Sequence, residues 1–434
     1  MNSATLPPNA RPLSPNVTSD SVEAFVSGIS TKLANEDHLD LAVLFRNTFP
    51  RTLDTGIAFI DDYQAAISTG DIPAMWIRDS VNQVLHLAPF ADDPVIQRVL
   101  CGVVGRLTTG ILIDPFANAF NFDLAASSSE HSNDHTTMQP GIFERKYELD
   151  SWASYVQIVN EVGTLCHRHQ DEIGRALGII LEKVVKLQSL DFSEYNFQRW
   201  TTEPTESLPR GSIKPAAYTG MVPSAFRPSD DACQLPFLVP ANAFFSVELA
   251  KLSAKAGPWP EMIRNEAGRL SEEIRNGIET FGKIGTHGKV AVYAYEVDGF
   301  GSAIFMDDAN LPSLLSLPLM GYLTVDDKTY QSTRALLLSD KTNPWFFTGS
   351  DVQGIGSPHT GPGRVWPLGL MTQFLTSSNA EERRIILSQL IDISRVNGLF
   401  FESVKASSIT DYTRADFGWA NSFFPRVVLD FLRK

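Results

Sequence analysis

The chain has 434 residues, of which 43% are hydrophobic and 20% are charged, and its formal net charge is −14. This composition is typical of a soluble globular protein, and the negative charge argues against a nucleic-acid backbone or an anionic membrane as partner. No stretch is expected to span a bilayer. The three cysteines, Cys101, Cys166 and Cys233, lie far apart, so the sequence indicates neither a disulfide framework nor a zinc ribbon.

Residues 1–20 are rich in Pro, Ser and Asn and are predicted to form a disordered lead-in to a single domain over residues 21–434. This segment has no apolar core of a secretory signal, which predicts a cytoplasmic protein, or a secreted one if the sequence lacks its leader. The sequon at Asn16 is therefore expected to be unmodified.

Helical periodicity dominates after this segment. Over residues 92–112, Asp93 is a candidate cap, Pro94 stands at the first helical position, and apolar residues recur at helical spacing from Ile96. Further helices are predicted over residues 21–34, 37–50, 79–88, 148–166, 170–189, 240–256, 258–282, 310–322, 327–338, 363–377, 380–396 and 414–432.

Long polar segments rich in Gly, Pro and aromatic residues separate some of these helix pairs, at 113–147, 196–239, 284–309 and 340–362. Strand-like patches, such as residues 289–297, are few and short. Paired helices with long loops are typical of an all-α (α/α) toroid, in which a rigid scaffold holds functional loops at one end. The sequence therefore predicts one all-α domain with a site built from loops.

Two loop segments carry carboxylates in unusual settings. In "RPSDDA" (227–232), Ser229 or Asp230 could cap a following helix, which leaves a second carboxylate free to point into a cavity near Arg227. In "LFFESV", Glu402 follows two phenylalanines, and apolar surroundings raise a carboxyl pKa, as a general base requires. The alternative is that Glu402 faces outward at the end of an element.

Together the two segments offer what glycoside hydrolysis needs, one carboxylic acid and one carboxylate on either side of a bond. They are far apart in the sequence, so only a closed, toroidal fold would bring them face to face. Other chemistries have weaker support, since there is no GxSxG motif, and the spaced glycines of 354–363 lack a strand–turn–helix context.

Histidine clusters at 131–135 and 166–169 are the only candidates for metal ligands. His167 and His169 stand two apart on a predicted helix and would point to different faces. His131 and His135 fall in a polar loop, so we expect no metal site. His359, in a Gly- and Pro-rich turn, is instead a candidate partner for sugar hydroxyls.

Six segments in order resemble glycoside hydrolase family 125: "GDIPAMWIRDS", "FERKYELDS", "RPSDDA", "FMDDANLPSLL", "GPGRVWPL" and "GLFFESV" followed by "DYTRADFGWAN". The resemblance runs from about residue 40 to residue 424. It implies an exo-acting α-1,6-mannosidase with an (α/α)6 barrel. The family is inverting and needs no metal or cofactor.

The resemblance also implies residue roles. The general acid falls on Asp231 or Asp230, with Asp231 slightly preferred, and the general base on Glu402. Arg78 and Asp79 would bind the hydroxyls of the terminal mannose, beside Trp76. Further pocket residues implied by the resemblance are Glu148, Asp150, Arg227, Asp308, Asn310, His359, Arg364 and Trp366.

The expected function is thus release of terminal mannose, as the β-anomer, from an α-1,6-linked mannose oligosaccharide such as an N-glycan or mannan fragment. We expect a monomer that binds neither nucleic acid nor membrane. The acid must stay protonated near neutral pH, through burial or the second aspartate. Two alternatives stay open: another exo-α-glycosidase on the same barrel, such as an α-glucosidase, and a catalytically inactive mannose-binding protein.

Overall fold

A computed structural model describes residues 12, 14–70, 72–127, 129–255, 257–285 and 291–433. The chain divides into two compact units. Unit 1 comprises Met1–Pro73, Asp79–Val103 and Trp345–Lys434, and unit 2 comprises Ala74–Arg78 and Val104–Pro344. Most of the predicted lead-in lies outside the described residues. In the part that is described, the Asn16 and Val17 N–H groups donate to the carbonyls of Asp54 and Leu53, each at 3.0 Å.

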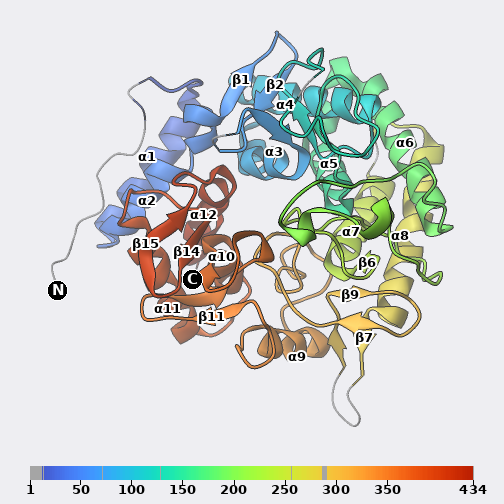
Figure 1. Cartoon of the computed structure of the whole chain (residues 1–434). Coiled ribbons are helices and arrows are strands. Elements are labelled where there is room, and N and C mark those ends of the chain that lie inside the picture. Colours follow the sequence, from blue (N-terminus) through green and yellow to red (C-terminus); the bar gives the residue numbers. More distant parts are fainter. Residues whose placement is uncertain are drawn as a thin grey trace. The chain divides into compact units, whose positions relative to one another are not determined.

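Unit 1 is built mainly from helices that contact one another in pairs. Helix α1 (Asp20–Asn35) packs on α2 (Leu39–Thr48), and α10 (Pro367–Leu375) contacts both α11 (Ala380–Ser394) and α12 (Gly418–Phe431). Figure 1 shows α1 and α2 side by side at the N-terminal end of the coloured chain. Short helical turns complete the unit: η1 (Thr52–Gly56), η2 (Leu85–Phe90) and η7 (Pro358–Thr360).

The helix starts of unit 1 follow from capping chemistry. The Ser19 hydroxyl accepts the Val22 N–H at the start of α1, and the Asn379 side chain accepts the N–H groups of Glu381 and Glu382 at the start of α11. Helices α10 and α12 are buried on nearly all sides, whereas α1 and α11 bury only one face. The buried helices therefore form an inner layer and the amphipathic ones an outer layer of this unit.

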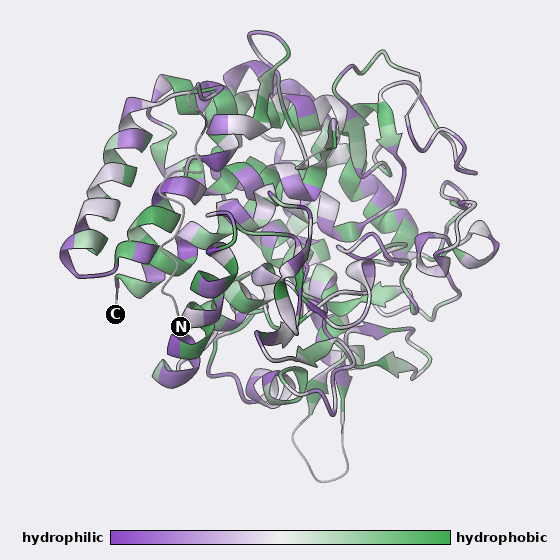
Figure 2. Cartoon of the chain, turned by 60° about the vertical axis from the view of Figure 1, so that its left-hand side comes forward, coloured by the Kyte–Doolittle hydropathy of each residue, from purple (hydrophilic) through white to green (hydrophobic). Residues whose placement is uncertain are grey.

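Unit 2 repeats this arrangement with other helices. Helix α5 (Leu149–Val162) contacts α7 (Val239–Ala254), which packs along α8 (Glu261–Phe281), and α8 also contacts α6 (Gln170–Gln188). Helices α5 and α7 bury nearly every residue, while α6 and α8 bury a single stripe. Figure 2 shows the matching alternation of hydrophobic and hydrophilic residues along the helices. The other helical elements of unit 2 are α9 (Lys328–Leu337) and the turns η3 (Gly163–Leu165), η4 (His167–His169), η5 (Pro204–Glu206) and η6 (Pro209–Gly211).

Two helices, α3 (Ile77–Val84) and α4 (Pro94–Ile113), contribute residues to both units. Helix α4 begins where the sequence predicted, and Asp93 accepts the Val95 N–H at 2.8 Å as its cap. With 20 residues and a mean hydropathy of 1.4, α4 is long and apolar enough to cross a membrane, which corrects the expectation that no stretch is. However, 67% of the most apolar 18-residue stretch of α4 is buried inside the protein, as in the core helix of a soluble protein.

In the described part of the chain the strands are short and form six small antiparallel sheets. The sheet that matters most for the site orders β3 (Ala74–Trp76), β4 (Ala119–Asn121) and β5 (Ile142–Glu144), with β4 in the middle. The other strands are β1 (Ile57–Phe59), β2 (Ala65–Ile67), β6 (Phe237–Leu238), β7 (Lys283–Ile284), β8 (Val292–Tyr293), β9 (Glu296–Val297), β10 (Ala303–Ile304), β11 (Phe346–Thr348), β12 (Gln353–Ile355), β13 (Arg364–Val365), β14 (Ser403–Lys405) and β15 (Ser408–Thr413).

The structure corrects three further expectations. No helix forms over 310–322, because Pro312 and Pro318 lack N–H donors and the hydroxyls of Ser313 and Ser316 bond to nearby backbone groups. No helix follows directly on "RPSDDA" for Ser229 or Asp230 to cap, since α7 begins only at Val239. Cys101 and Cys166 are each disulfide-bonded, whereas Cys233 is free and buried.

The remaining predicted helices are confirmed, with ends that differ by a few residues. The strand-like patch at 289–297 begins outside the described residues and contains β8 and β9 in its described part.

Candidate active site

Arg78 lies near the start of helix α3, directly after strand β3, and strand β4 fixes both elements. Trp76 pairs in register with Ala119, and the Ile77 N–H donates to the Asn118 carbonyl at 2.9 Å. These backbone bonds anchor the chain on both sides of the "MWIRD" segment. The position of the Arg78 side chain is therefore set by a sheet, which the sequence analysis did not predict in this segment.

The Arg78 guanidinium gathers three carboxylates from distant segments. Its Nη1 donates to Glu148 Oε2 at 2.7 Å and to Asp150 Oδ2 at 3.1 Å, and its Nη2 donates to Asp230 Oδ1 at 3.5 Å. We call these four residues the Arg78 cluster. Arg78, Glu148 and Asp150 are at most 3% exposed. Buried charges of this kind persist because they are paired and hydrogen-bonded.

Two carboxyls of the Arg78 cluster, those of Glu148 and Asp150, hold protons more tightly than exposed ones. Burial raises the pKa of Glu148 well above its usual range; Arg78 opposes this shift, and the charge of Asp230 adds to it. Burial likewise raises the pKa of Asp150 to about 6, again against the effect of Arg78. One positive charge faces three acidic groups, so the cluster retains a proton near neutral pH.

The two candidate acids lie on a tight turn and differ in exposure. The Arg227 N–H donates to the Asp231 carbonyl at 2.8 Å, and the Asp230 N–H donates to the Arg227 carbonyl at 2.9 Å. Asp230 has a φ of +65°, in the left-handed region that non-glycine residues seldom adopt. Its side chain is 23% exposed, whereas Asp231 is 3% exposed and accepts the Ser229 hydroxyl at 2.8 Å.

Arg227, Asp308 and Asn310 surround one another near Asp231, since the charges of Asp231 and Arg227 both shift the pKa of Asp308. The Arg227 Nε donates to Glu296 Oε1 at 2.5 Å, so its charge is matched by a fully buried carboxylate. Asp308 accepts both the backbone N–H and the side-chain amide of Asn310. Burial raises the pKa of Asp308; these hydrogen bonds oppose the shift, and the charge of Asp231 adds to it.

Glu402, the candidate base, belongs to unit 1 and stands immediately before β14. Its N–H donates to the carbonyls of Thr413 and Arg414, at 3.3 and 3.4 Å, at the end of the neighbouring strand β15. Its side chain is buried, and Oε1 accepts the Arg414 Nε at 3.2 Å. His359 Nε2 lies 3.9 Å from the same oxygen. The expectation of an outward-facing glutamate is thus excluded.

The other predicted residues of unit 1 are placed differently. Trp366 is buried, its Nε1 donates to Thr360 at 2.8 Å, and its ring centroid lies 6.3 Å from that of His359. The Arg364 guanidinium forms an ion pair with Asp411, in which Nη2 donates to Oδ1 at 2.6 Å. Trp366 therefore lies with His359, whereas Arg364 serves a separate contact.

The predicted residues thus fall into two groups. Unit 2 holds Trp76, Arg78, Glu148, Asp150, Arg227, Asp230, Asp231, Asp308 and Asn310, and unit 1 holds Asp79, His359, Arg364, Trp366 and Glu402. Trp76 is 7% exposed and packs edge-on against Phe143 at 5.3 Å, and Asp79 is 4% exposed. Within unit 2 the structure joins segments 70 to 152 residues apart into one acidic site.

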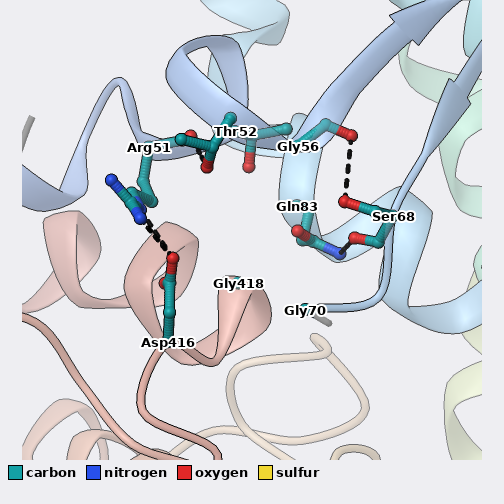
Figure 3. A pocket seen from close by; sticks show the side chains of 9 residues that line it. Arg51, Thr52, Gly56, Ser68, Gly70, Gln83, Asp416 and Gly418 are labelled. Carbon is teal, nitrogen blue, oxygen red and sulfur yellow. Dashed lines mark hydrogen bonds and ion pairs between the residues drawn. The ribbon is translucent and has the colours of Figure 1, made fainter. Parts of the chain in front are cut away.

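Unit 1 also contains a small polar pocket that the sequence reasoning missed (Figure 3). Its volume is about 120 Å³, and Arg51 is paired with Asp416 on one wall while Gln83 donates to the Ser68 carbonyl at 3.3 Å on the other. The lining residues are Arg51, Thr52, Thr55, Gly56, Ser68, Gly70, Gln83, Asp416 and Gly418. The segment "DYTRADFGWAN" contained two of these residues, but no pattern in the sequence linked it to Arg51.

Sequence reasoning also missed two basic residues inside the quoted motifs. Lys146 of "FERKYELDS" is 1% exposed, and its Nζ donates to the Asp230 carbonyl at 3.0 Å. Arg414 of "DYTRAD" holds Glu402 as described above. A buried cation is rare in proteins, and only the three-dimensional contacts reveal one. Within the described ranges, no group of three or more His, Cys, Asp or Glu side chains could hold a metal ion.

Comparison with known proteins places this geometry in a family. The family described as metal-independent alpha-mannosidase (GH125) matches residues 38–429. The meiotically up-regulated gene 157 protein of Schizosaccharomyces pombe is 38% identical over 445 residues, covering 96% of this chain and 86% of that protein.

A solved structure of a Streptococcus pneumoniae member of a family of metal-independent alpha mannosidases, in a non-productive complex with α-1,6-mannobiose, is 34% identical. It superposes with a TM-score of 0.90 and covers 96% of this chain and 99% of that one. A bacterial glucoamylase complexed with acarbose shares only 11% identity over 96% of this chain and 62% of that one, at a TM-score of 0.52, and shows the fold alone. The predicted (α/α)6 barrel is confirmed.

Proposed function

Because the chain belongs to the family of metal-independent α-mannosidases (GH125), we propose that it removes terminal mannose from α-1,6-linked mannosides with inversion of configuration. The chain is a glycoside hydrolase of the α-mannosidase class. The observation that supports the finer proposal is the buried acidic site around Arg78, in a fold that a relative with bound α-1,6-mannobiose shares at a TM-score of 0.90. The proposed ligand is therefore an α-1,6-linked mannose oligosaccharide.

We assign the general acid to Asp230 rather than Asp231. A general acid must reach the glycosidic oxygen, and the Asp230 side chain is 23% exposed while Asp231 is 3% exposed. Asp231 is also occupied by the Ser229 hydroxyl. Asp230 lies beside Glu148, whose pKa burial raises, so a proton is available within the Arg78 cluster. This assignment reverses the slight preference for Asp231 that the resemblance gave.

We assign the general base to Glu402. Arg414 and His359 both contact its Oε1, so we assign the attacking water to the other oxygen, Oε2. The neighbouring Phe401 is fully buried and stacks on Tyr412 with ring centroids 3.9 Å apart, which fixes the segment that carries Glu402. A base held at the start of a strand by packing and two contacts is preorganised for its role.

The proposed reaction is a single displacement. Protonated Asp230 gives its proton to the glycosidic oxygen as the bond from that oxygen to C1 breaks. A water attacks C1 from the opposite face while Glu402 takes the proton that the water loses, and β-mannose leaves. Asp230 ends as carboxylate and Glu402 as carboxylic acid, so the two protons balance. In inverting enzymes the two carboxyls stand about 6.5–9.5 Å apart, which leaves room for the water.

Arg78 has a different proposed role from the one the resemblance implied. Its terminal nitrogens donate to Glu148, Asp150 and Asp230. We propose that it orders these carboxyls, which then bind the sugar hydroxyls. Direct contact between Arg78 or Asp79 and mannose stays a prediction.

Linkage-specific digestion tests the proposed function. The purified chain is incubated with α-1,6-, α-1,3- and α-1,2-mannobiose and with the 4-nitrophenyl α-glucoside and α-mannoside. We expect hydrolysis of the α-1,6 isomer at least ~10-fold faster than of the other two, since a wrongly linked isomer loses hydrogen bonds whose net worth is about 0.5–1.5 kcal/mol each. Preferred cleavage of the glucoside would establish the α-glucosidase alternative. Binding of mannobiose without cleavage would establish an inactive mannose-binding protein.

A further inference from the structure

Lys146 places a buried ammonium group against the main chain of the candidate acid. The residue is 1% exposed, and its Nζ donates to the Asp230 carbonyl at 3.0 Å. The same nitrogen lies 5.3 Å from the centre of the Phe226 ring. Phe226 pairs with Ala232, so these two residues close the turn that carries Asp230. Lys146 therefore contacts this turn at its base and at its tip.

Glu144 does not by itself explain why a lysine is buried there. Its Oε1 lies 3.5 Å from Lys146 Nζ, but the same carboxylate accepts Arg199 Nη2 at 2.8 Å and Asn118 Nδ2 at 2.9 Å. Glu144 therefore has hydrogen-bond donors other than Lys146, although Arg199 also pairs with Asp134 and the charge of Lys146 lowers the pKa of Glu144 more than that of Arg199 does. The contact that depends on Lys146 is the shorter one, to the Asp230 carbonyl.

The hydrogen bond from Lys146 to the Asp230 carbonyl matters because Asp230 has an unusual backbone conformation. Its φ of +65° lies in the left-handed region, which a residue with a Cβ occupies only when its surroundings hold it there. Within this conformation the carboxylate reaches Arg78 Nη2 at 3.5 Å while the side chain stays 23% exposed. An extended conformation at this position would turn the carboxylate away from the Arg78 cluster.

We propose that Lys146 is a positioning residue that holds the Asp230 carbonyl and so keeps the carboxylate of Asp230 directed at the scissile bond. This inference rests on the proposed function, in which Asp230 is the general acid. Because Lys146 is 1% exposed, its proposed action on the substrate runs through the turn that carries Asp230. Burial lowers the pKa of Lys146, but the charges of Glu144 and Asp230 outweigh burial and raise it, so the ammonium stays charged while the enzyme works.

The test compares two substrates whose leaving groups differ in their need for a proton. In Lys146→Met, kcat/KM on α-1,6-mannobiose should fall about 100-fold, because acid catalysis contributes about 10²–10⁴-fold. On 2,4-dinitrophenyl α-mannoside, whose leaving group departs without a proton, it should fall less than about 3-fold, for the same reason. A merely structural role for Lys146 would lower both rates by the same factor.

Comparing Lys146→Met with the double variant Glu144→Gln/Lys146→Met separates two effects of Lys146: its hydrogen bond to the Asp230 carbonyl and its neutralisation of Glu144. We expect Glu144→Gln/Lys146→Met to stay as impaired on mannobiose as Lys146→Met, because neither restores the donor to the Asp230 carbonyl. Recovery of activity in the double variant would overturn the proposal. Lys146→Gln, whose amide can still donate one hydrogen bond, serves as the second variant if Lys146→Met does not fold, and should show the same selective loss to a smaller degree.

A crystal structure of Lys146→Met keeps this test distinct from that of the proposed function. We expect Asp230 to leave the left-handed region and its carboxylate to leave Arg78. An unchanged Asp230 conformation would overturn the proposal, whatever the kinetics show. If Asp230→Asn loses activity equally on both substrates, the assignment of Asp230 as acid fails, while the structure of Lys146→Met still reports whether the lysine holds the turn.

Discussion

Arg78 Nη1 lies 2.7 Å from Glu148 Oε2, and both side chains are almost completely buried. This ion pair stands at the centre of the Arg78 cluster, because the same nitrogen also reaches Asp150. The arrangement of Glu148, Asp150 and Asp230 therefore depends on the guanidinium of Arg78. The stability of unit 2 and the protonation of the site are therefore coupled through Arg78.

Arg78→Met should destabilise the protein by about 3–5 kcal/mol, since it leaves buried carboxylates without their partner. The loss should be smaller at pH 5 than at pH 8, because the raised pKa values of Glu148 and Asp150 let both groups protonate at the lower pH. Urea unfolding at the two pH values measures this.

The matched control is Arg384→Met, whose ion pair with Glu381 joins side chains that are 69% and 63% exposed. It should leave the free energy of unfolding almost unchanged, because solvent screens an exposed ion pair. Equal losses in the two variants would contradict the role given to Arg78.

Asp307 should make stability fall as the pH rises. It is fully buried, and burial raises its pKa to about 8. The hydrogen bonds from the N–H groups of Leu314 and Leu315 oppose this rise but do not cancel it. The folded state then keeps a proton that the unfolded chain releases near pH ~4, so stability decreases between these two values. In Asp307→Asn the melting temperature should fall less between pH 5 and pH 8 than in the parent. The same slope in both proteins would show that Asp307 ionises normally.

Gly418 should not tolerate a side chain. A Cβ at this position would lie 2.1 Å from Gln83 Oε1, on the wall of the polar pocket in Figure 3. Gln83 is buried and donates to the Ser68 carbonyl, so it cannot move without losing that bond. Gly418→Ala should therefore lower the free energy of unfolding by about 1–3 kcal/mol.

Gly174 in α6 provides the matched control, because nothing lies within 4 Å of a Cβ built there. Gly174→Ala should be neutral or stabilise the protein by up to about 1 kcal/mol. The measurement is the thermal unfolding of both variants. If Gly418→Ala proves as stable as Gly174→Ala, the Gln83 side chain moves aside at little cost.

The two carboxyl roles should separate kinetically. Glu402→Gln should lower kcat by about 10²–10⁴-fold on both mannobiose and 2,4-dinitrophenyl α-mannoside, because the water needs a base in either case. Asp230→Asn should lose activity on mannobiose and retain most of it on the dinitrophenyl substrate. Glu381→Gln, at a largely exposed position, should behave as the parent. If Asp231→Asn shows the selective loss instead of Asp230→Asn, the acid is Asp231.

Periodicity was enough to predict most helices, because burial of one stripe or of a whole helix leaves its spacing in the sequence. Helix α4, with Asp93 and Pro94 at its start, is the clearest instance. The predicted helix at 310–322 failed where Pro312 and Pro318 remove N–H donors inside an apolar pattern. An apolar pattern of helical spacing carries no information on missing N–H donors, so it also occurs where prolines prevent a helix.

The site was predictable only as a set of segments. Motifs identified Arg78, Glu148 and Asp230 individually, but their meeting at one guanidinium depends on strand pairing and turns that bring distant segments together. The left-handed conformation of Asp230 and the buried contact of Lys146 leave no local pattern in the sequence. Long-range partners of charged residues are set by tertiary structure, and these were the features that sequence reasoning missed.

The anomeric form of the first product tests the central claim most directly. The claim is that two carboxyls, Asp230 as acid and Glu402 as base, cleave an α-mannoside by a single displacement through water. Proton NMR of α-1,6-mannobiose hydrolysis, recorded before mutarotation, follows the newly formed anomeric signal. Our account predicts β-mannose as the first product. Initial release of α-mannose would contradict it, because retention requires a covalent intermediate and carboxyls only about 5–5.5 Å apart.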